Sequence, residues 1–332
     1  MTDFSVAPPS FTVVRGGVDP TTPLRGSLRG GVLAIGNFEG VHRGHRAVIG
    51  AAIARARQLG RPAAALTFEP HPRSYFNRET AVFRLSDVTI KLRLLAASGL
   101  DGAIVLDFDA TLAALDASAF VERVLVGLFD VAGVVIGHDF HFGKGRTGSP
   151  EFLAAEGRQR GFSVDIVSPF EDGGRRISSG LVRAALQAGQ VDEASELLGY
   201  PWFVTGEVVH GDKRGRELGY PTANIRLDPA CSLRHGVYAV RVGLGGKIHD
   251  GVANFGRRPM FDTGAVLLEV FLFDFSSDLY GATLDVAFIG WIRHELKFDS
   301  IAELVRRMDE DSRQARALLA RTPVAPLPPT LD

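Results

Sequence analysis

The sequence predicts two domains of different fold class: an α/β domain built on a parallel sheet, followed by a small antiparallel β-barrel with a C-terminal helix. The length of 332 residues fits about two domains. Short apolar strands alternate with helices up to residue 188, which is typical of a parallel sheet covered on both faces. From residue 202 to 289 strand follows strand with glycine-rich turns, which is typical of a small closed barrel.

In the α/β domain, predicted over residues 1–188, each strand after the first precedes a helix. Gly60 and Pro62 stop the first long helix, and Gly99 follows the next as a C-terminal cap. Ligands of such sheets bind beyond the carboxyl ends of the strands. The expected strands cover residues 11–14, 31–35, 63–68, 102–108, 132–136 and 163–167, and the expected helices cover residues 44–59, 87–98, 117–128, 150–160 and 178–188.

The barrel domain is predicted over residues 189–322. Ser300 and Glu303 form the pattern of a capping box, which opens a long helix over residues 299–320. The last residues, 323–332, contain four prolines and are expected to be a loose tail. The other expected elements are a helix at 188–198 and strands at 203–210, 236–244, 266–273 and 284–289.

The composition excludes several classes of protein. A net charge of -1, from 37 basic and 38 acidic residues, argues against nucleic acid or a membrane surface as the main partner. Hydrophobic residues at 45% and charged residues at 23% exclude disorder for most of the chain. We expect neither a membrane span nor a signal peptide. The single cysteine, Cys231, can form no internal disulfide, so a cytoplasmic protein is expected.

The first chemical motif covers residues 36–45, between a buried strand and a helix. It reads Gly-Asn-Phe-Glu-Gly-Val-His-Arg-Gly-His. Glycine-flanked N–H groups and a helix N-terminus attract an anion. His42 and His45 can both face a phosphate, where imidazole N–H donors would stabilise charge on an α-phosphate during nucleotidyl transfer. The alternative is a glycine-rich turn with surface histidines, which the position at a strand-to-helix junction disfavours.

The second motif is a glycine ladder in the barrel, with Gly211, Gly215 and Gly219 ahead of Thr222 and Asn224. A flexible glycine loop can fold over phosphates. In an extended segment Thr222 and Asn224 point to the same side. Their hydroxyl and amide oxygens suit Mg²⁺ shared with ATP phosphates. The alternative is a solvated hairpin.

The third feature is Glu269, which strand alternation places on the same face as Leu267, Phe271 and Phe273. A carboxylate among apolar side chains is costly unless it is paired or functional. Such a group can act as a base that takes a proton from an alcohol. The alternative is an outward-facing carboxylate on an edge strand.

These motifs resemble one family. Residues 36–45 are similar to the G-N-F-D-G-V-H-x-G-H signature of the bifunctional riboflavin kinase/FAD synthetases, which belong to the nucleotidyltransferases with an H-x-G-H pair and no lysine P-loop. The segment ending in Thr222 and Asn224 resembles the riboflavin kinase signature G-x-P-T-A-N. The resemblance runs from about residue 12 to residue 318. It continues at residues 67–72, 137–143, 177–183, 236–240, 251–259 and 297–300.

The resemblance implies a Rossmann-like nucleotidyltransferase domain, a riboflavin kinase barrel and two reactions. The barrel would transfer the γ-phosphate of ATP to riboflavin, giving FMN. The first domain would then transfer AMP from ATP to FMN, giving FAD and pyrophosphate. Mg²⁺ would accompany ATP, and no permanently bound organic cofactor would be required. ATP, riboflavin and FMN are thus the expected small-molecule partners.

The resemblance also implies roles for individual residues. Glu269 would be the base of the kinase, Thr222 and Asn224 its metal ligands, and His42 and His45 the catalytic pair of the adenylyltransferase. Nucleotide-binding roles are implied for His42, His45, Gly36, Asn37, Phe38, Asp139, Ser178, Ser179, Arg183, Gly211, Gly215, Gly219, Thr222 and Asn224. Flavin-binding roles are implied for Phe68, Pro70, Phe140, Phe142 and Glu269. For Phe140 and Phe142 the sequence alone equally favours a place in the hydrophobic core.

Three positions depart from the family pattern. Glu39 replaces the usual Asp, Gly180 replaces Ser or Thr after the two serines, and Phe271 stands where His often follows the catalytic Glu. The first two bear on adenylylation, and the third bears on flavin contacts in the kinase site.

Two other functions remain open at this point. The chain could be an enzyme of the same superfamily that acts on another phosphorylated substrate, such as a pantetheine or glycerol phosphate, but the barrel argues against this. It could also be a non-catalytic flavin- or nucleotide-sensing protein. Incubation with riboflavin, ATP and Mg²⁺ distinguishes all three.

Overall fold

The structure is a computed structural model that describes residues 10–18, 27–77, 82–210, 219–257 and 266–331. The chain forms two compact units. The sheet unit contains the parallel sheet and extends to Ser178, and it also includes residues from 328 onward. The barrel unit begins at Ser179 and also includes residues 83–85. The compact units thus separate before the helix that the sequence assigned to the first domain.

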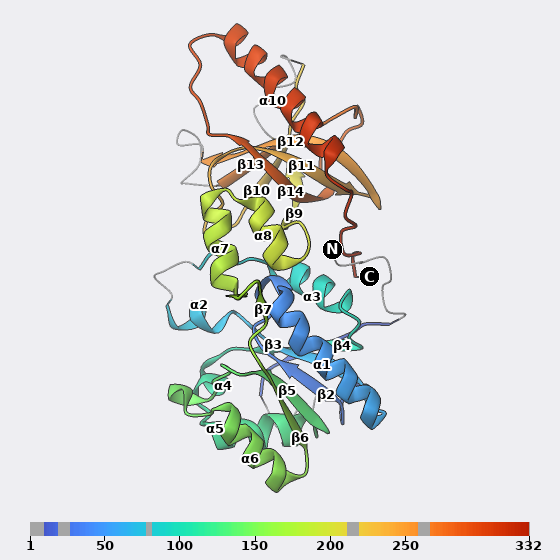
Figure 1. Ribbon diagram of the computed structural model, residues 1–332, viewed down its shortest axis with the longest axis vertical. Helices are drawn as coiled ribbons and strands as arrows, with labels where there is room; N and C mark the ends of the chain where they lie inside the picture. The colour runs from blue at the N-terminus through green and yellow to red at the C-terminus, as the bar shows by residue number, and fades with distance from the viewer. Residues whose placement is uncertain (1–9, 19–26, 78–81, 211–218, 258–265, 332) are drawn as a thin grey trace. The chain divides into compact units, whose positions relative to one another are not determined.

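The predicted fold class of the sheet unit is confirmed. Its six strands lie in the order β1-β4-β3-β2-β5-β6, and every neighbouring pair is parallel. The chain moves outward from β2 to β4 and then returns to the other side of β2 as β5 (Figure 1). The strands are β1 (Thr12–Gly16), β2 (Val32–Ile35), β3 (Ala63–Glu69), β4 (Gly102–Asp107), β5 (Gly133–Gly137) and β6 (Ser163–Val167). The order therefore reverses between β2 and β5, where ligands of such sheets bind.

Helices and turns cover this sheet and form its core. Leu33 and Ile35 of β2 are buried together with Val121, Val124 and Leu125. The segment predicted as one helix over 117–128 is a short α-helix that continues in wider π-helical turns. The elements are η1 (Glu39–Val41), α1 (Arg43–Leu59), α2 (Pro72–Phe76), α3 (Val88–Ala96), α4 (Ala110–Ala114), α5 (Ala117–Phe120), η2 (Val121–Leu128), η3 (Lys144–Arg146), α6 (Pro150–Arg160), β7 (Glu171–Asp172) and β8 (Arg175–Arg176).

The barrel unit is a closed antiparallel barrel in the order β10-β13-β12-β11-β14-β9, which confirms the second predicted fold class. In β13 the side chains of Val266, Leu268 and Val270 are fully buried, whereas Leu267 and Glu269 are half-buried on the outer face. Strands β10 and β12 were not predicted as strands. The elements are α7 (Ser179–Ala188), α8 (Val191–Leu198), β9 (Phe203–Val209), β10 (Ala223–Leu227), β11 (Gly236–Leu244), β12 (Lys247–Arg257), β13 (Val266–Leu272), β14 (Thr283–Arg293) and α10 (Ile301–Arg321).

Helix α10 lies against the outside of the barrel, as Figure 1 shows in red. Ala315 and Leu319 on this helix are buried against Phe273, with Phe271 packed beside them. The predicted capping box is confirmed, because the N–H of Glu303 donates to the Ser300 hydroxyl at 3.2 Å. The Glu303 carboxylate in turn accepts from the N–H of Asp299 at 3.4 Å.

The proline-rich tail, expected to be loose, is held by hydrogen bonds although it forms no helix or strand. In the barrel unit the buried Arg241 donates to the carbonyls of Leu319 at 2.9 Å, Thr322 at 2.6 Å and Pro323 at 2.5 Å. In the sheet unit the buried Arg93 donates to the carbonyl of Pro328 at 2.5 Å. Because a proline carbonyl still accepts hydrogen bonds, a proline-rich segment can be fixed through its backbone oxygens.

Replacing Arg241 with methionine should destabilise the barrel unit by about 2–4 kcal/mol, because one buried and two partly buried carbonyls lose their donor. Tryptophan fluorescence during urea unfolding measures this unit alone, since both tryptophans, Trp202 and Trp291, belong to it. The control is Arg313→Met, which removes a largely exposed ion pair to Glu310 and should change stability by less than about 1 kcal/mol. Equal unfolding midpoints for the two variants would show that Arg241 does not fix the tail.

Candidate active sites

The first site lies in the loop that joins β2 to α1, at the point where the strand order reverses. Phe38 and Val41 in this loop have positive φ angles of 48° and 38°, which non-glycine residues rarely adopt. Both side chains are buried, at 1% and 0% exposure. The Phe38 ring lies next to Gly36, where an added Cβ would be 3.3 Å from the ring. Packing thus fixes an unusual backbone path that leads directly to His42.

The side chain of His42 caps helix α1. Its Nδ1 accepts a hydrogen bond from the backbone N–H of His45 at 3.2 Å. Because Nδ1 is an acceptor, the proton of the neutral ring lies on Nε2. The two imidazole rings stack with centroids 3.6 Å apart and planes 15° apart. The predicted histidine pair is therefore brought together, and the cap occupies Nδ1 of His42 but not its Nε2.

The surroundings of His45 favour its neutral form. Burial lowers the pKa of His45 well below 6.5, and His42, Lys91 and Arg46 lower it further through their positive charge. Its Nδ1 is buried without a hydrogen-bond partner among the described residues. The first turn of α1 contains no acidic residue, so the positive end of the helix is not neutralised. An anion placed there would meet the neutral His45 ring and a positive helix end.

Glycine at position 44 allows two segments to meet at this helix end. A Cβ on Gly44 would lie 3.2 Å from the His42 ring and 3.6 Å from the carbonyl oxygen of Ile177. Ser178, a predicted nucleotide-binding residue, follows Ile177 directly. The structure thus places the backbone before Ser178 beside the histidine motif. Ser179 and Arg183 belong to the barrel unit, where Arg183 Nε donates to the carbonyl of Phe83 at 2.6 Å.

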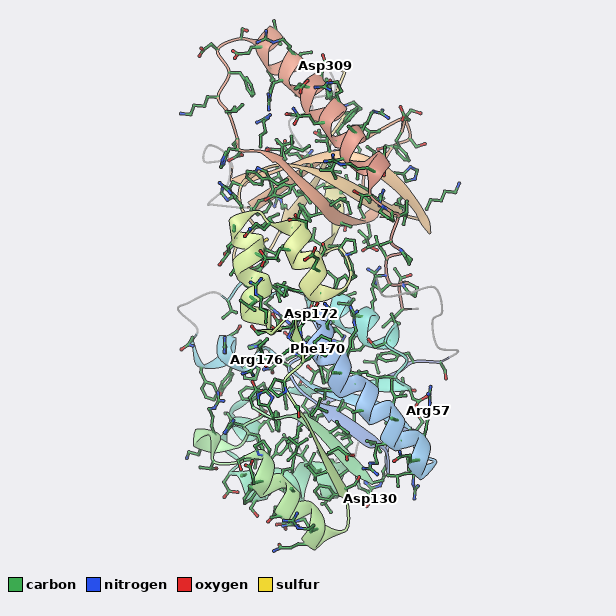
Figure 2. The ribbon with its side chains drawn as sticks, viewed as in Figure 1. Arg57, Asp130, Phe170, Asp172, Arg176 and Asp309 are labelled. Atoms are coloured by element: carbon green, nitrogen blue, oxygen red, sulfur yellow. The ribbon has the colours of Figure 1, made fainter. Side chains whose placement is uncertain are left out.

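A small hairpin formed by β7 and β8, which the sequence analysis did not predict, connects both sides of this site. Arg43, within the histidine motif, forms an ion pair with Asp172 and lies 5.2 Å from the centroid of the Phe170 ring. On the other side Arg176 forms an ion pair with the predicted site residue Asp139 at 2.5 Å. Figure 2 labels Phe170, Asp172 and Arg176. The hairpin therefore joins the loop after β5 to the start of α1.

The predicted flavin-binding aromatics after β5 divide into a core residue and a partly exposed one. Phe142 is 8% exposed and lies 5.3 Å from Phe120 and 6.2 Å from Phe152, measured between ring centroids. Phe140 is half-buried and stacks on Phe142 at 5.5 Å. Only Phe140 therefore has appreciable ring surface available to a ligand.

A second aromatic group lies at the carboxyl ends of β3 and β4, and sequence reasoning found only one of its members. The predicted residue Phe68 contacts Phe108 at 6.0 Å. Phe108 also contacts Tyr75 at 5.4 Å and Phe76 at 5.7 Å. Phe76 is 65% exposed, which is unusual for so large an apolar side chain. The Tyr75-Phe76 pair, three residues after Pro72, was the signal available in the sequence. Pro70, also predicted, is exposed beside Phe68.

The second site lies on the outer face of the barrel. Residues directly opposite each other in neighbouring antiparallel strands share a face of the sheet. Asn224 of β10 and Asn254 of β12 are each directly opposite Glu269 of β13. The structure therefore brings the predicted Asn224 and Glu269 together and adds Asn254, which the sequence analysis quoted within residues 251–259 without a role.

The oxygen of the Asn224 side chain is available to a ligand. Asn224 is 7% exposed, and its Nδ2 donates to the carbonyl oxygen of Thr222 at 3.4 Å. Its Oδ1 is buried with no hydrogen-bond partner among the described residues. A buried oxygen acceptor without a donor fits a cation better than it fits an empty core. The donor set therefore fits Mg²⁺, with Thr222 half-buried two residues earlier.

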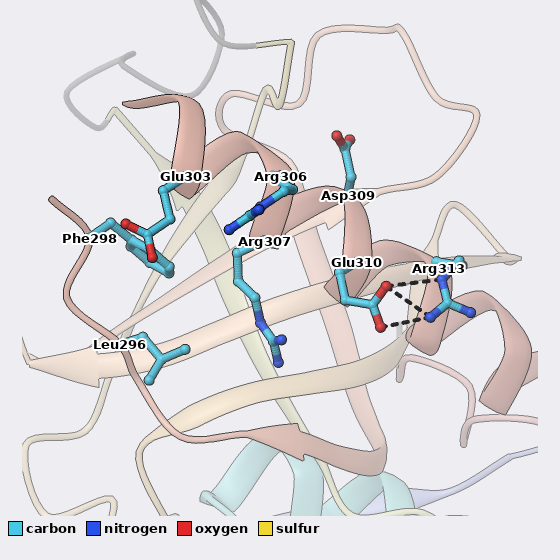
Figure 3. A pocket seen from close by; sticks show the side chains of 8 residues that line it. All are labelled: Leu296, Phe298, Glu303, Arg306, Arg307, Asp309, Glu310 and Arg313. Carbon is cyan, nitrogen blue, oxygen red and sulfur yellow. Dashed lines mark hydrogen bonds and ion pairs between the residues drawn. The ribbon is translucent and has the colours of Figure 1, made fainter. Parts of the chain in front are cut away.

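A pocket of about 540 Å³ lies between α10 and the segment that precedes it (Figure 3). The Tyr220 ring packs on Phe271 at 4.9 Å, and its hydroxyl donates to Asp309, which lines the pocket. Burial and the neighbouring Asp309 raise the pKa of Tyr220 to about 12, so the hydroxyl remains a donor. The residues lining the pocket are Leu296, Phe298, Glu303, Arg306, Arg307, Asp309, Glu310 and Arg313.

The glycine ladder is only partly described by the structure. Gly219 has a φ of 85°, a left-handed conformation that favours glycine. Gly211 and Gly215 lie outside the described residues. Their predicted contact with phosphates stays a prediction.

Comparisons with known proteins match a different family model to each part of the chain. The family model for FAD synthetase matches residues 25–181, and that for riboflavin kinase matches residues 198–319. None of the helices in the described part of the chain is both long enough and apolar enough to cross a membrane.

Individual relatives match over most of their length. A bifunctional riboflavin kinase/FMN adenylyltransferase from Pseudomonas fluorescens is 42% identical over 90% of this chain and 96% of that protein. The protein with this description from Escherichia coli K12 is 42% identical over 88% and 94%. A crystal structure described as a macrolide-efflux protein from Streptococcus pneumoniae is 32% identical, with a TM-score of 0.81 over 91% of this chain and 99% of that one.

The His45 ring should remain neutral at pH 6, where an ordinary histidine with a pKa of about 6.5 is mostly protonated. The unfolded chain protonates this ring near pH 6.5, and the folded chain does so only at lower pH. Folding stability should therefore fall as the pH drops below about 6.5. An NMR titration of the histidine rings, assigned with His45→Gln, measures the protonation directly. Protonation of His45 at or above pH 6.5 would contradict the prediction.

Proposed function

The chain belongs to the family of bifunctional riboflavin kinase/FMN adenylyltransferases, and on that basis we propose which of its residues perform the two reactions. The protein is a transferase that phosphorylates riboflavin with ATP to give FMN, and adenylylates FMN with ATP to give FAD. We assign adenylylation to residues 1–188 and phosphorylation to residues 189–322, on the family matches and the two groups of candidate residues.

In the adenylyltransferase, His42 and His45 act on the α-phosphate of ATP. A phosphate oxygen of FMN attacks the α-phosphorus, and pyrophosphate leaves. The N–H on Nε2 of His42 donates to the α-phosphate oxygens, supported by the stacked and neutral His45. Removing one donor of this kind typically costs about 3–4 kcal/mol of transition-state stabilisation. Main-chain N–H groups at the start of α1 and the residues Gly36, Asn37 and Phe38 complete the cradle.

The other assignments at this site follow the resemblance. Ser178 and Asp139 of the sheet unit hold the nucleotide. The roles of Ser179 and Arg183, which belong to the barrel unit, stay predictions from the resemblance. The flavin ring of FMN lies on the aromatic group at the ends of β3 and β4, with Phe68 and Pro70 as predicted and Phe76 added because of its exposure. Phe140 supplies a further ring face, and Phe142 supports Phe140 from the core.

In the kinase, Glu269 takes the proton from the 5′-hydroxyl of riboflavin as the hydroxyl oxygen attacks the γ-phosphorus, and ADP leaves. Mg²⁺ would be held by Asn224 and Thr222 together with ATP phosphates, and would neutralise charge on the transferring group. Gly211, Gly215 and Gly219 form the loop over the phosphates. The strand register that places Glu269 opposite Asn224 supports this assignment, since one face then carries both the base and a metal ligand.

The pocket beside α10 is the place for the riboflavin ring. Its volume of about 540 Å³ is within the usual range for small-molecule sites. Phe298 offers an aromatic surface, and Arg306 has no ionic partner among the described residues. Tyr220 contacts both Asp309, which lines the pocket, and Phe271, which lies two residues after Glu269, and this connection supports the proposal.

The single observation that carries the adenylyltransferase assignment is the stacked histidine pair at the reversal point of the sheet. His42→Ala should lower FAD formation from FMN by about 10²–10³-fold because a preorganised donor is lost. It should leave FMN formation from riboflavin unchanged.

Glu269→Ala should do the reverse: it should stop FMN formation from riboflavin and still convert supplied FMN to FAD. Chromatography of the flavins after incubation with ATP and Mg²⁺ measures both reactions. Glu207→Ala, which removes an exposed carboxylate on β9, is the matched control and should retain both activities. Loss of both activities in either site variant would contradict two independent sites.

Asn224→Ala should raise the Mg²⁺ concentration needed for half-maximal riboflavin phosphorylation by roughly tenfold, because one oxygen ligand is lost. Adenylylation of FMN by the same variant is the internal control, and its Mg²⁺ dependence should not change. An unchanged Mg²⁺ dependence of phosphorylation would remove Asn224 from the metal site.

A further inference from the structure

Helix α3 directs two cations into the interior of the sheet unit. Lys91 is 0% exposed and Arg93 is 2% exposed. The tail explains the burial of Arg93, because the guanidinium donates to the carbonyls of Pro328 and Pro329. Lys91 has no role in the chemistry assigned so far. A buried ammonium is costly, so its surroundings indicate what it does.

The ammonium of Lys91 begins a chain of hydrogen bonds that ends in the histidine loop. Its Nζ lies 3.4 Å from the hydroxyl oxygen of Thr67, which is fully buried. That hydroxyl donates to the carbonyl oxygen of Asn37 at 3.2 Å. A threonine hydroxyl has a single proton, so when it donates to Asn37 it must accept from Lys91. The chain therefore has a fixed direction, from the ammonium to the loop backbone.

The loop that receives this chain is the one with the unusual backbone. Asn37 directly precedes Phe38, the first of the two non-glycine residues in this loop that have a positive φ. A residue in that conformation costs of order 1–3 kcal/mol and persists only where its surroundings impose it. Thr67 fixes the carbonyl on one side, and the Ser86 hydroxyl accepts from the N–H of Gly40 at 3.1 Å on the other. His42 follows two residues after Gly40, so its position depends on these two contacts.

The positive charge of Lys91 also acts on the histidine pair. It lowers the pKa of His45, with burial as the larger cause and with His42 and Arg46 acting in the same direction. Glu69, a partner of the Lys91 ammonium at 3.8 Å, is partly exposed. A buried cation near an anion site favours negative charge there, because the protein interior screens it weakly.

We propose that Lys91 is a positioning residue of adenylyl transfer, which holds the Asn37–His42 loop through Thr67 and favours negative charge at the histidine pair. This inference rests on the assignment of His42 and His45 to adenylyl transfer. Lys91 does not touch the reacting atoms. Lys91 acts through the hydrogen bonds that hold the loop and through the electrostatic field of its ammonium group.

A purely structural role would be better served by an apolar side chain. Methionine would fill nearly the same space without the cost of removing a charge from water. Replacing one partner of an ion pair is strongly destabilising where the other charge stays buried, so the outcome depends on Glu69. Glu69 would retain access to water after the replacement, since 24% of its side chain is exposed. Lys91→Met should therefore fold, which makes it a suitable test.

Lys91→Met should lower the kcat of FMN adenylylation at least tenfold, with the KM values for ATP and FMN changed by less than about threefold. Riboflavin phosphorylation should not change. In the NMR titration, the pKa of His45 should rise because one neighbouring positive charge is gone. Thr67→Val is the matched variant: it keeps the ammonium and removes the hydroxyl, so it should lower kcat while affecting the His45 titration less than Lys91→Met does.

Wild-type kcat in Lys91→Met would overturn the proposal, as would an unchanged His45 titration in that variant. If Lys91→Met does not fold, the Thr67→Val variant decides. A wild-type kcat in Thr67→Val would overturn the role of the hydrogen-bond chain from Lys91 to Asn37. His42→Ala is assayed in parallel. FAD formation by His42→Ala would remove the histidine pair itself from the reaction, whereas an inactive His42→Ala beside a fully active Lys91→Met would reject only the role of Lys91.

Discussion

The hydrogen bond from the backbone N–H of His45 to Nδ1 of His42 is the contact on which the first site depends. It caps helix α1, and it also fixes which nitrogen of His42 carries the proton. A serine or aspartate could cap the helix equally well, but neither would present an N–H donor to an anion. The same residue therefore ends the loop, starts the helix and supplies a donor at the positive end of the helix, and the stack with His45 follows from this geometry.

The second site depends on a different constraint, the alternation of side chains along a strand. Because Val266, Leu268 and Val270 fill the barrel, Glu269 must face outward, toward the side that α10 covers. The register then places Asn224 and Asn254 beside it. Packing of the barrel core therefore determines where the base lies, and a shift of the register by one residue would turn Glu269 into the core.

Sequence reasoning found what is local and missed what depends on long-range contacts. The histidine motif, the Thr222–Asn224 segment and the capping box at Ser300 are short patterns that can be recognised in the sequence. The structure places the histidine motif and the capping box at the starts of the expected helices, and it places Asn224 on β10, which was not predicted as a strand. In the sequence Lys91 looks like an ordinary helical lysine. Its burial became visible only in the fold, where α3 brings it to Thr67 and Glu69 at the end of β3. The aromatic group around Phe108 joins residues from three separate segments. The contacts of the tail could not be predicted, because proline content indicates missing N–H donors and says nothing of the arginines that bind the tail carbonyls.

The two sites differ in a way that the chemistry of their nucleophiles explains. The phosphate of FMN carries about 1.5 to 2 negative charges near neutral pH, so it can attack without losing a proton. The barrier to its attack is electrostatic, because the FMN phosphate and the triphosphate of ATP are both negatively charged. The sheet unit accordingly contains imidazole donors, a helix N-terminus and a buried lysine near one another. The hydroxyl of riboflavin is neutral and must lose a proton as it attacks, which requires a base. A carboxylate is therefore needed on β13 of the barrel, whereas neutral donors and positive charge are sufficient in the sheet unit.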